Sequence, residues 1–164
     1  MKTLLFGSTL LCLLASPAHA QLRQVDDLSL AAANKLANAA VAACRAQGRH
    51  MVVSVLDRGG NLVTVQRADG VGPHNTEASR RKAYTALSTK NDTQALAVAA
   101  RGNPDMANLT TVPELLLLGG GLPLRAKGEV IGAIGVAGGG GALPDRACAL
   151  AALAAMPELN LPTP

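Results

Sequence analysis

Residues 79–87 hold the side chains best suited to binding an anion, in the sequence Ser-Arg-Arg-Lys-Ala-Tyr-Thr-Ala-Leu. If this stretch is helical, Arg81 and Tyr84 lie toward the face opposite the core, and Lys82 lies at the border between the two faces. A lysine at such a border buries its methylene stem and directs its ammonium group at an anionic partner. Guanidinium and ammonium groups suit carboxylates, which makes Arg81 and Lys82 candidates for holding them. A solvated basic face is the alternative interpretation.

His74 is the candidate metal-ligating residue. It follows Gly72-Pro73 in a constrained loop just before a predicted helix, where an imidazole would project toward a cleft. Histidine is the commonest metal-ligating side chain, and the alternative interpretation is an exposed loop histidine. His50 precedes a predicted strand, and we expect it to be a surface or strand-end residue.

Two glycine clusters, residues 119–121 and 138–141, invite comparison with phosphate-binding loops. Neither ends in the Lys-Ser/Thr pair of such a loop, and no Gly-x-Gly-x-x-Gly follows a predicted strand. Tight turns and close backbone packing are the favoured interpretation. The alternative is a glycine-lined surface approached by a large flat ligand or a second subunit, in which Gly120 and Gly121 would contact the ligand. No Gly-x-Ser-x-Gly motif indicates a hydrolase.

Residues 1–20 have the pattern of a secretory signal peptide, in which Lys2 is followed by the apolar residues 4–14 and the small-x-small cleavage site Ala18-His19-Ala20. Cleavage there would leave residues 21–164, a length that suits a single domain. We therefore expect a periplasmic or secreted protein. No later apolar run approaches the ~18 residues that a membrane span needs, so we expect no span in the mature chain.

The composition of residues 21–164 argues against nucleic acid as a partner. The whole chain has 15 Lys and Arg against 11 Asp and Glu, and loss of Lys2 with the leader lowers the net charge from +4 to +3. No long basic run interleaved with aromatic residues accompanies this mild charge. Tyr84 is then the only aromatic residue, because the chain has no Trp and its one Phe is Phe6. A pocket within one chain therefore offers little stacking area to a flat ring.

Two cysteines follow the leader, Cys44 and Cys148. In an oxidising compartment the pair allows one intrachain disulfide, and two small buried thiols are the alternative. Neither cysteine has a second Cys or a His at metal-ligand spacing.

Apolar periodicity and turn chemistry predict helices over residues 30–46, from 75 or 76 to about 88, 93–101 and 146–156, and strands over 51–56, 62–67, 115–118, 122–126 and 129–136. Ser29 and Asp145 are the expected N-caps of the first and last helices. We expect a hairpin loop at residues 57–61, and an edge position for the strand that contains Pro123. This order predicts an α/β sandwich with a mostly antiparallel sheet of about five strands.

Three sets of motifs, in chain order, resemble one family. They are Val53-Ser54-Val55-Leu56-Asp57-Arg58-Gly59-Gly60-Asn61-Leu62 with Arg67-Ala68-Asp69-Gly70, then Gly72-Pro73-His74 with Arg81-Lys82-Ala83-Tyr84-Thr85-Ala86, and finally Leu118–Leu124 with Gly128–Val136. Together they are similar to the GlcG/HbpS-type heme-binding family and to the C-terminal domain of PduO-type proteins. The resemblance covers roughly residues 28–156, nearly the whole chain after the leader.

The resemblance implies a profilin-like three-layer sandwich, assembly into dimers or larger oligomers and, in some members, binding of heme or another tetrapyrrole. For exported members it also implies heme or iron sensing, partly through a membrane sensor protein. The usual Ser after the Gly-Ala-Ile-Gly-Val segment is Ala137 here, so the resemblance assigns no axial ligand.

We therefore expect an exported heme-binding protein in which His74 ligates the metal, Arg81 and Lys82 lie near the propionates, and Tyr84, Gly120 and Gly121 line the site. With one aromatic residue, the chain is expected to hold the ring at a subunit interface or in a shallow groove.

Two other functions stay open at the sequence level. One is a small periplasmic enzyme or accessory protein that acts on an organic acid or redox metabolite, with Asp57, His74 and Lys82 converging as acid/base groups. The other is an oligomeric interaction module without a cofactor. A non-catalytic role is favoured over an enzymatic one.

Overall fold

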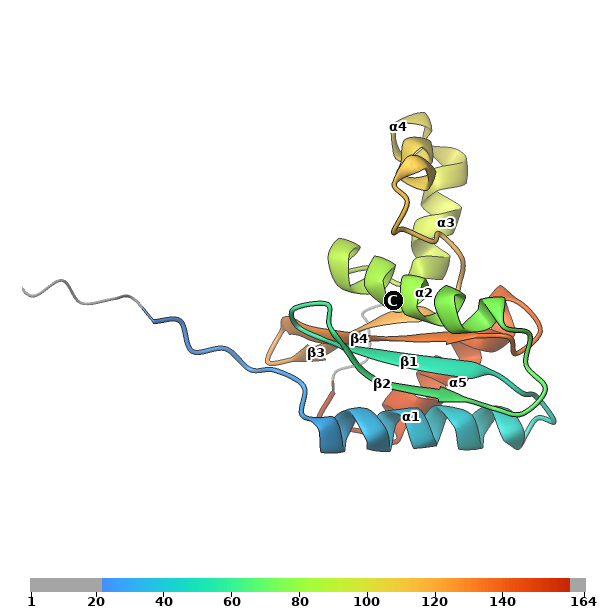
Figure 1. Cartoon of the computed structure of the whole chain (residues 1–164). Helices are drawn as coiled ribbons and strands as arrows, with labels where there is room; N and C mark the ends of the chain where they lie inside the picture. The colour runs from blue at the N-terminus through green and yellow to red at the C-terminus, as the bar shows by residue number, and fades with distance from the viewer. Residues whose placement is uncertain (1–21, 160–164) are drawn as a thin grey trace, which may run out of the picture.

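A four-stranded sheet lies at the centre of the structure, a computed structural model that describes residues 22–159 (Figure 1). Its strands are β1 (Val52–Asp57), β2 (Leu62–Arg67), β3 (Gly121–Ala126) and β4 (Glu129–Ala137), in the order β2-β1-β4-β3. Every neighbouring pair is antiparallel. The predicted leader, residues 1–20, lies outside the described residues.

Helices cover both faces of the sheet and make three layers (Figure 1). Helices α1 (Leu30–Arg45) and α5 (Ala142–Ala154) pack on one face, and α2 (His74–Thr89) packs on the other. Beyond α2, the segment formed by α3 (Thr93–Gly102), α4 (Pro104–Ala107) and the 3-10 turn η1 (Asn108–Thr111) projects away from the sheet as an arm. The predicted α/β architecture with an antiparallel sheet is confirmed.

The prediction of a fifth strand at residues 115–118 is wrong, because that apolar segment pairs with no strand of the described chain. Its backbone bonds instead to side chains of α2. The Leu116 N–H donates to Thr85 Oγ1 at 2.8 Å, and Arg81 Nη2 donates to the Leu115 carbonyl at 2.7 Å. Once helix side chains satisfy these polar groups, the segment needs no strand neighbour.

The helix starts also differ from the local capping rules. Gly141, and not Asp145, is the N-cap of α5, and α2 begins at His74 without a side-chain cap from Asn75 or Thr76. Ser29 caps α1 as predicted, with its side chain accepting from the N–H of Ala32. The strand of Pro123 lies at an edge of the sheet, also as predicted, since a proline there costs no ladder hydrogen bond.

The core consists of aliphatic residues and has a larger and a smaller half. The larger half lies between the sheet and α1 with α5, where Leu36, Val53, Ile134 and Leu153 are fully or almost fully buried. The smaller half, under α2, is built on Leu56 and the alanines 83, 86 and 133. Small residues there let the α2 backbone approach the sheet closely.

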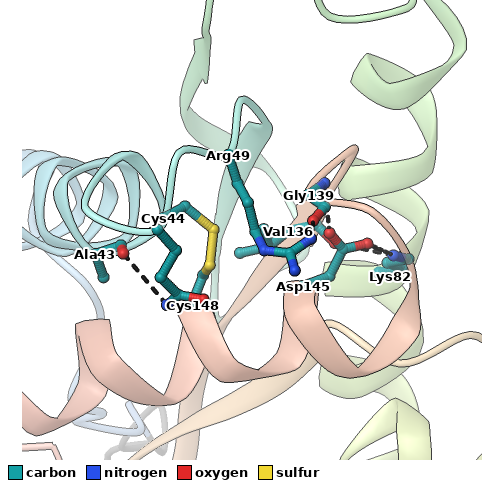
Figure 2. Close-up of a disulfide and its surroundings, with 9 residues drawn as sticks. Ala43, Cys44, Arg49, Lys82, Val136, Gly139, Asp145 and Cys148 are labelled. Carbon is teal, nitrogen blue, oxygen red and sulfur yellow. Dashed lines mark hydrogen bonds and ion pairs between the residues drawn. A yellow bond between two sulfur atoms is a disulfide. The ribbon is translucent and has the colours of Figure 1, made fainter.

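Of the two alternatives for the cysteines, the structure has the disulfide (Figure 2). Cys44 on α1 bonds Cys148 on α5, with the Cα atoms 5.4 Å apart and a sequence separation of 104. The bond therefore ties together the two helices that cover the same face of the sheet.

Gly135→Ala tests the close approach of α2. A Cβ at Gly135 would lie 2.6 Å from Ala83 N and would overlap the Ser79 carbonyl oxygen, both on the α2 backbone. We expect the substitution to lower the free energy of unfolding by about 2–3 kcal/mol, as overpacked cores do, measured by urea denaturation. Gly102→Ala is the matched control, because its added methyl meets nothing within 4 Å. Equal stability of the two variants would contradict this packing.

Reduction of the disulfide is expected to destabilise the chain. A loop of about 100 residues gains about 4–5 kcal/mol from a cross-link in the chain-entropy account. Urea unfolding of the oxidised and the dithiothreitol-reduced protein should differ by a large part of this amount. Thiol alkylation followed by mass measurement checks the starting state, and two alkylated thiols without prior reduction would rule out the bond.

Candidate functional site

A buried ion pair joins α2 to α5 around the end of β4. Lys82 of α2 is 1% exposed, and its Nζ lies 2.7 Å from Oδ2 of Asp145, which is 2% exposed (Figure 2). The same Nζ donates to the Val136 carbonyl of β4 at 3.0 Å. The second carboxylate oxygen, Oδ1, accepts from the N–H of Gly139 at 2.7 Å.

Burial lowers the pKa of the Lys82 ammonium group, and the hydrogen bond and charge of Asp145 act against that lowering. Neither charge reaches water, so each depends on the other and on the surrounding backbone for its solvation. The pair therefore fixes α2 relative to the first turn of α5.

Gly120 and Gly121 lie beside this pair, so the structure brings three of the six predicted site residues together. A Cβ at Gly120, whose φ is +120°, would lie 3.2 Å from Lys82 Nζ and 2.9 Å from Asp145 Cβ. At Gly121 it would overlap the Lys82 carbonyl oxygen. All three residues are buried, and the two glycines make room for Lys82 itself.

His74 and Arg81 lie apart from that pair, at the start and in the middle of α2. His74 is the first residue of the helix and is exposed. Arg81 follows seven residues later, which places it on the same side of the helix, about 10 Å along the axis. Its Nη2 donates to the Leu115 carbonyl, while its buried Nε has no hydrogen-bond partner in the described structure. An exposed imidazole and a partly buried guanidinium thus share one side of α2.

Tyr84 belongs to a third location, at the opposite end of α2. It follows His74 by ten positions, about 15 Å along a helix. Its ring lies against the β1–β2 hairpin, where a Cβ on Gly60 would be 3.6 Å from Tyr84 Cε2. Together they line a groove of about 540 Å³ that also includes Arg58 and Arg125.

The acid/base group of Asp57, His74 and Lys82 does not assemble. Asp57 pairs with Gly132 near the start of β4 and accepts from the N–H of Asn61 at 2.8 Å inside the hairpin loop. Lys82 contacts Val136 instead, four residues further along β4, about 13 Å away. The three side chains therefore occupy separate parts of the molecule, which removes the observation behind the proposed catalytic group.

Sequence reasoning missed Asp145 and the arginines of the groove. Asp145 was expected to cap a helix, and nothing local indicates a partner 63 residues away. Arg58 and Arg125 each adjoin a glycine turn, which was the available signal, since both hairpins reach the same end of the sheet.

Comparison with known proteins assigns the chain to a family. Residues 28–154 match the model of a family described as "Haem degrading protein HbpS-like". The chain belongs to the HbpS-like family. The predicted resemblance to GlcG- and HbpS-type proteins is confirmed. GlcG of Escherichia coli K12 is 34% identical over 89 residues, which cover 51% of this chain and 61% of GlcG.

Solved structures of this family have the same fold. A double mutant of HbpS from Streptomyces reticuli is 39% identical, with a TM-score of 0.78 over 87% of this chain and 97% of that one. A PduOC crystallised as a complex with heme is 26% identical, with a TM-score of 0.73 over 81% of this chain and 96% of that one. Within residues 22–159, no helix is long and apolar enough for a membrane crossing.

Lys82→Met tests the buried pair. Removing one partner leaves an uncompensated buried charge, so we expect a loss of about 3–5 kcal/mol in the free energy of unfolding. Lys35→Met is the matched control, because its pair with Glu158 is mostly exposed and is expected to contribute less than about 1 kcal/mol. Adding Asp145→Asn to Lys82→Met should restore part of the loss. Additive losses in urea denaturation would contradict the pairing.

Proposed function

We propose that this HbpS-like chain is an exported heme-binding protein. The observation that carries the proposal is the match to PduOC in complex with heme, over 81% of this chain, together with the family's description as haem-degrading. The pattern of residues 1–20 supports export to the periplasm or outside the cell.

The start of α2 fits the polar groups of a heme. Heme iron, when bound, supplies a coordination position for a donor, and the exposed His74 imidazole offers that donor. Arg81, partly exposed on the same side of the helix, offers the positive charge of its guanidinium for a propionate. Lys82 has its ammonium committed to Asp145 and Val136, so we assign it to holding α2 in place.

Assembly is part of the proposal. Tyr84, the only aromatic residue after the leader, lies at the far end of α2 and leaves His74 without a ring to stack on the porphyrin. A second copy of the chain would cover the face of the porphyrin that this chain leaves exposed, which supports a homo-oligomer. From the family resemblance we infer a physiological role in sensing or handling heme and iron. A membrane sensor protein would be the partner that receives the signal.

Hemin titration of residues 21–164 tests the function, followed by Soret absorbance and native mass. We expect saturable binding with at most one heme per chain, weakened at least tenfold by His74→Ala, which corresponds to about 1.4 kcal/mol. His50→Ala is the matched control, since His50 is also exposed. Binding without saturation would indicate adsorption and end the proposal. Saturable binding unaffected by His74→Ala would keep heme and refute the ligand.

A further inference from the structure

A cationic groove lies at the end of α2 farthest from His74. It has a volume of about 540 Å³ and lies among the β1–β2 hairpin, the last turn of α2 and the β3–β4 hairpin. The basic residues that line it are Arg23, Arg58, Lys90 and Arg125, and the acidic one is Glu129. Four positive charges against one negative charge favour a ligand with more than one negative charge.

Protein contacts hold two of the guanidinium groups in place. Arg125 Nη2 donates to the Lys90 carbonyl at 2.9 Å. Arg58 Nη2 donates to Glu129 Oε2 at 2.6 Å, and its side chain is only 23% exposed. Each contact uses a fraction of the five N–H donors of an arginine, so donors remain for a ligand. Because the groups are already positioned, binding loses less conformational entropy.

An apolar wall faces these charges. Tyr84 and Leu87 line the groove one turn apart on α2, and both lie 3.6 Å from the Cβ position of Gly60. Gly60 has a φ of +84°, which lets the hairpin turn lie against the tyrosine ring. Such a wall favours a ligand with an organic body over a bare inorganic anion.

We propose that this groove binds a small organic anion that carries two or more carboxylates on a flat apolar body. The planar guanidinium groups of Arg58 and Arg125 would each take a carboxylate, and Tyr84 with Leu87 would contact the body. The volume lies within the ~300–1,000 Å³ range of small-molecule sites. The site goes beyond heme binding, because it shares no lining residue with the His74 and Arg81 group.

Tyr84 makes the test selective, because it is the chain's only tyrosine. The probe is benzene-1,3,5-tricarboxylate, titrated into residues 21–164 by calorimetry and by NMR of the Tyr84 ring protons. We expect saturable 1:1 binding that shifts these protons, at least tenfold tighter than for benzoate or pyrophosphate. Equally tight binding of benzoate would overturn the requirement for several carboxylates. Tighter binding of pyrophosphate would overturn the requirement for an organic body.

Variants locate the site. Arg58→Gln and Arg125→Gln should each weaken tricarboxylate binding at least tenfold, while Arg101→Gln, an exposed arginine on the arm, should leave it unchanged. Equal loss in all three would show attraction by net charge alone and overturn the site. If an arginine variant fails to fold, Lys90→Gln at an exposed position gives the same test. His74→Ala should bind the probe like wild type, which separates this site from heme binding.

Discussion

Two charges buried against each other, Lys82 and Asp145, constrain the position of the helix that carries both proposed sites. Neither charge is solvated by water, so each must meet the other and the backbone of β4 and the Gly138–Gly141 turn. This contact requires glycine at positions 120 and 121, since any side chain there would fill the space that Lys82 occupies. The pair does not bind a ligand in this arrangement, but it determines where α2 lies on the sheet.

Helix α2 then presents different chemistry at its two ends. Its first half offers the exposed imidazole of His74 and the partly exposed guanidinium of Arg81, which suit a metal-containing ring with carboxylates. Its end offers a tyrosine beside arginines that come from the two hairpins. The buried pair and the small residues under α2 fix this helix on the sheet between its two ends. Independent binding at the two ends is what this packing favours.

The sequence predicted what depends on local pattern. The strand over 62–67 has the predicted bounds, although its apolar Leu62 and Val65 are exposed, and the helix from Thr93 starts where expected. The prediction of a strand at 115–118 was wrong because an apolar run does not indicate which groups hydrogen-bond to its backbone. Here the side chains of Arg81 and Thr85 do so. The prediction that Asp145 caps the last helix was wrong for a related reason, since its carboxylate pairs with the distant Lys82 instead. The groove draws residues from four separate segments, which no spacing rule connects.

The disulfide between Cys44 and Cys148 has a topological consequence. The chain between these residues contains all four described strands, α2 and the projecting arm, so the backbone and the disulfide together form a closed covalent ring. A single proteolytic cut within the arm, which projects from the rest of the described molecule (Figure 1), opens this ring without separating it into two molecules. Both fragments would stay joined through α1 and α5, with β4 still between β1 and β3. After a nick in this projecting arm the protein therefore stays one covalent unit.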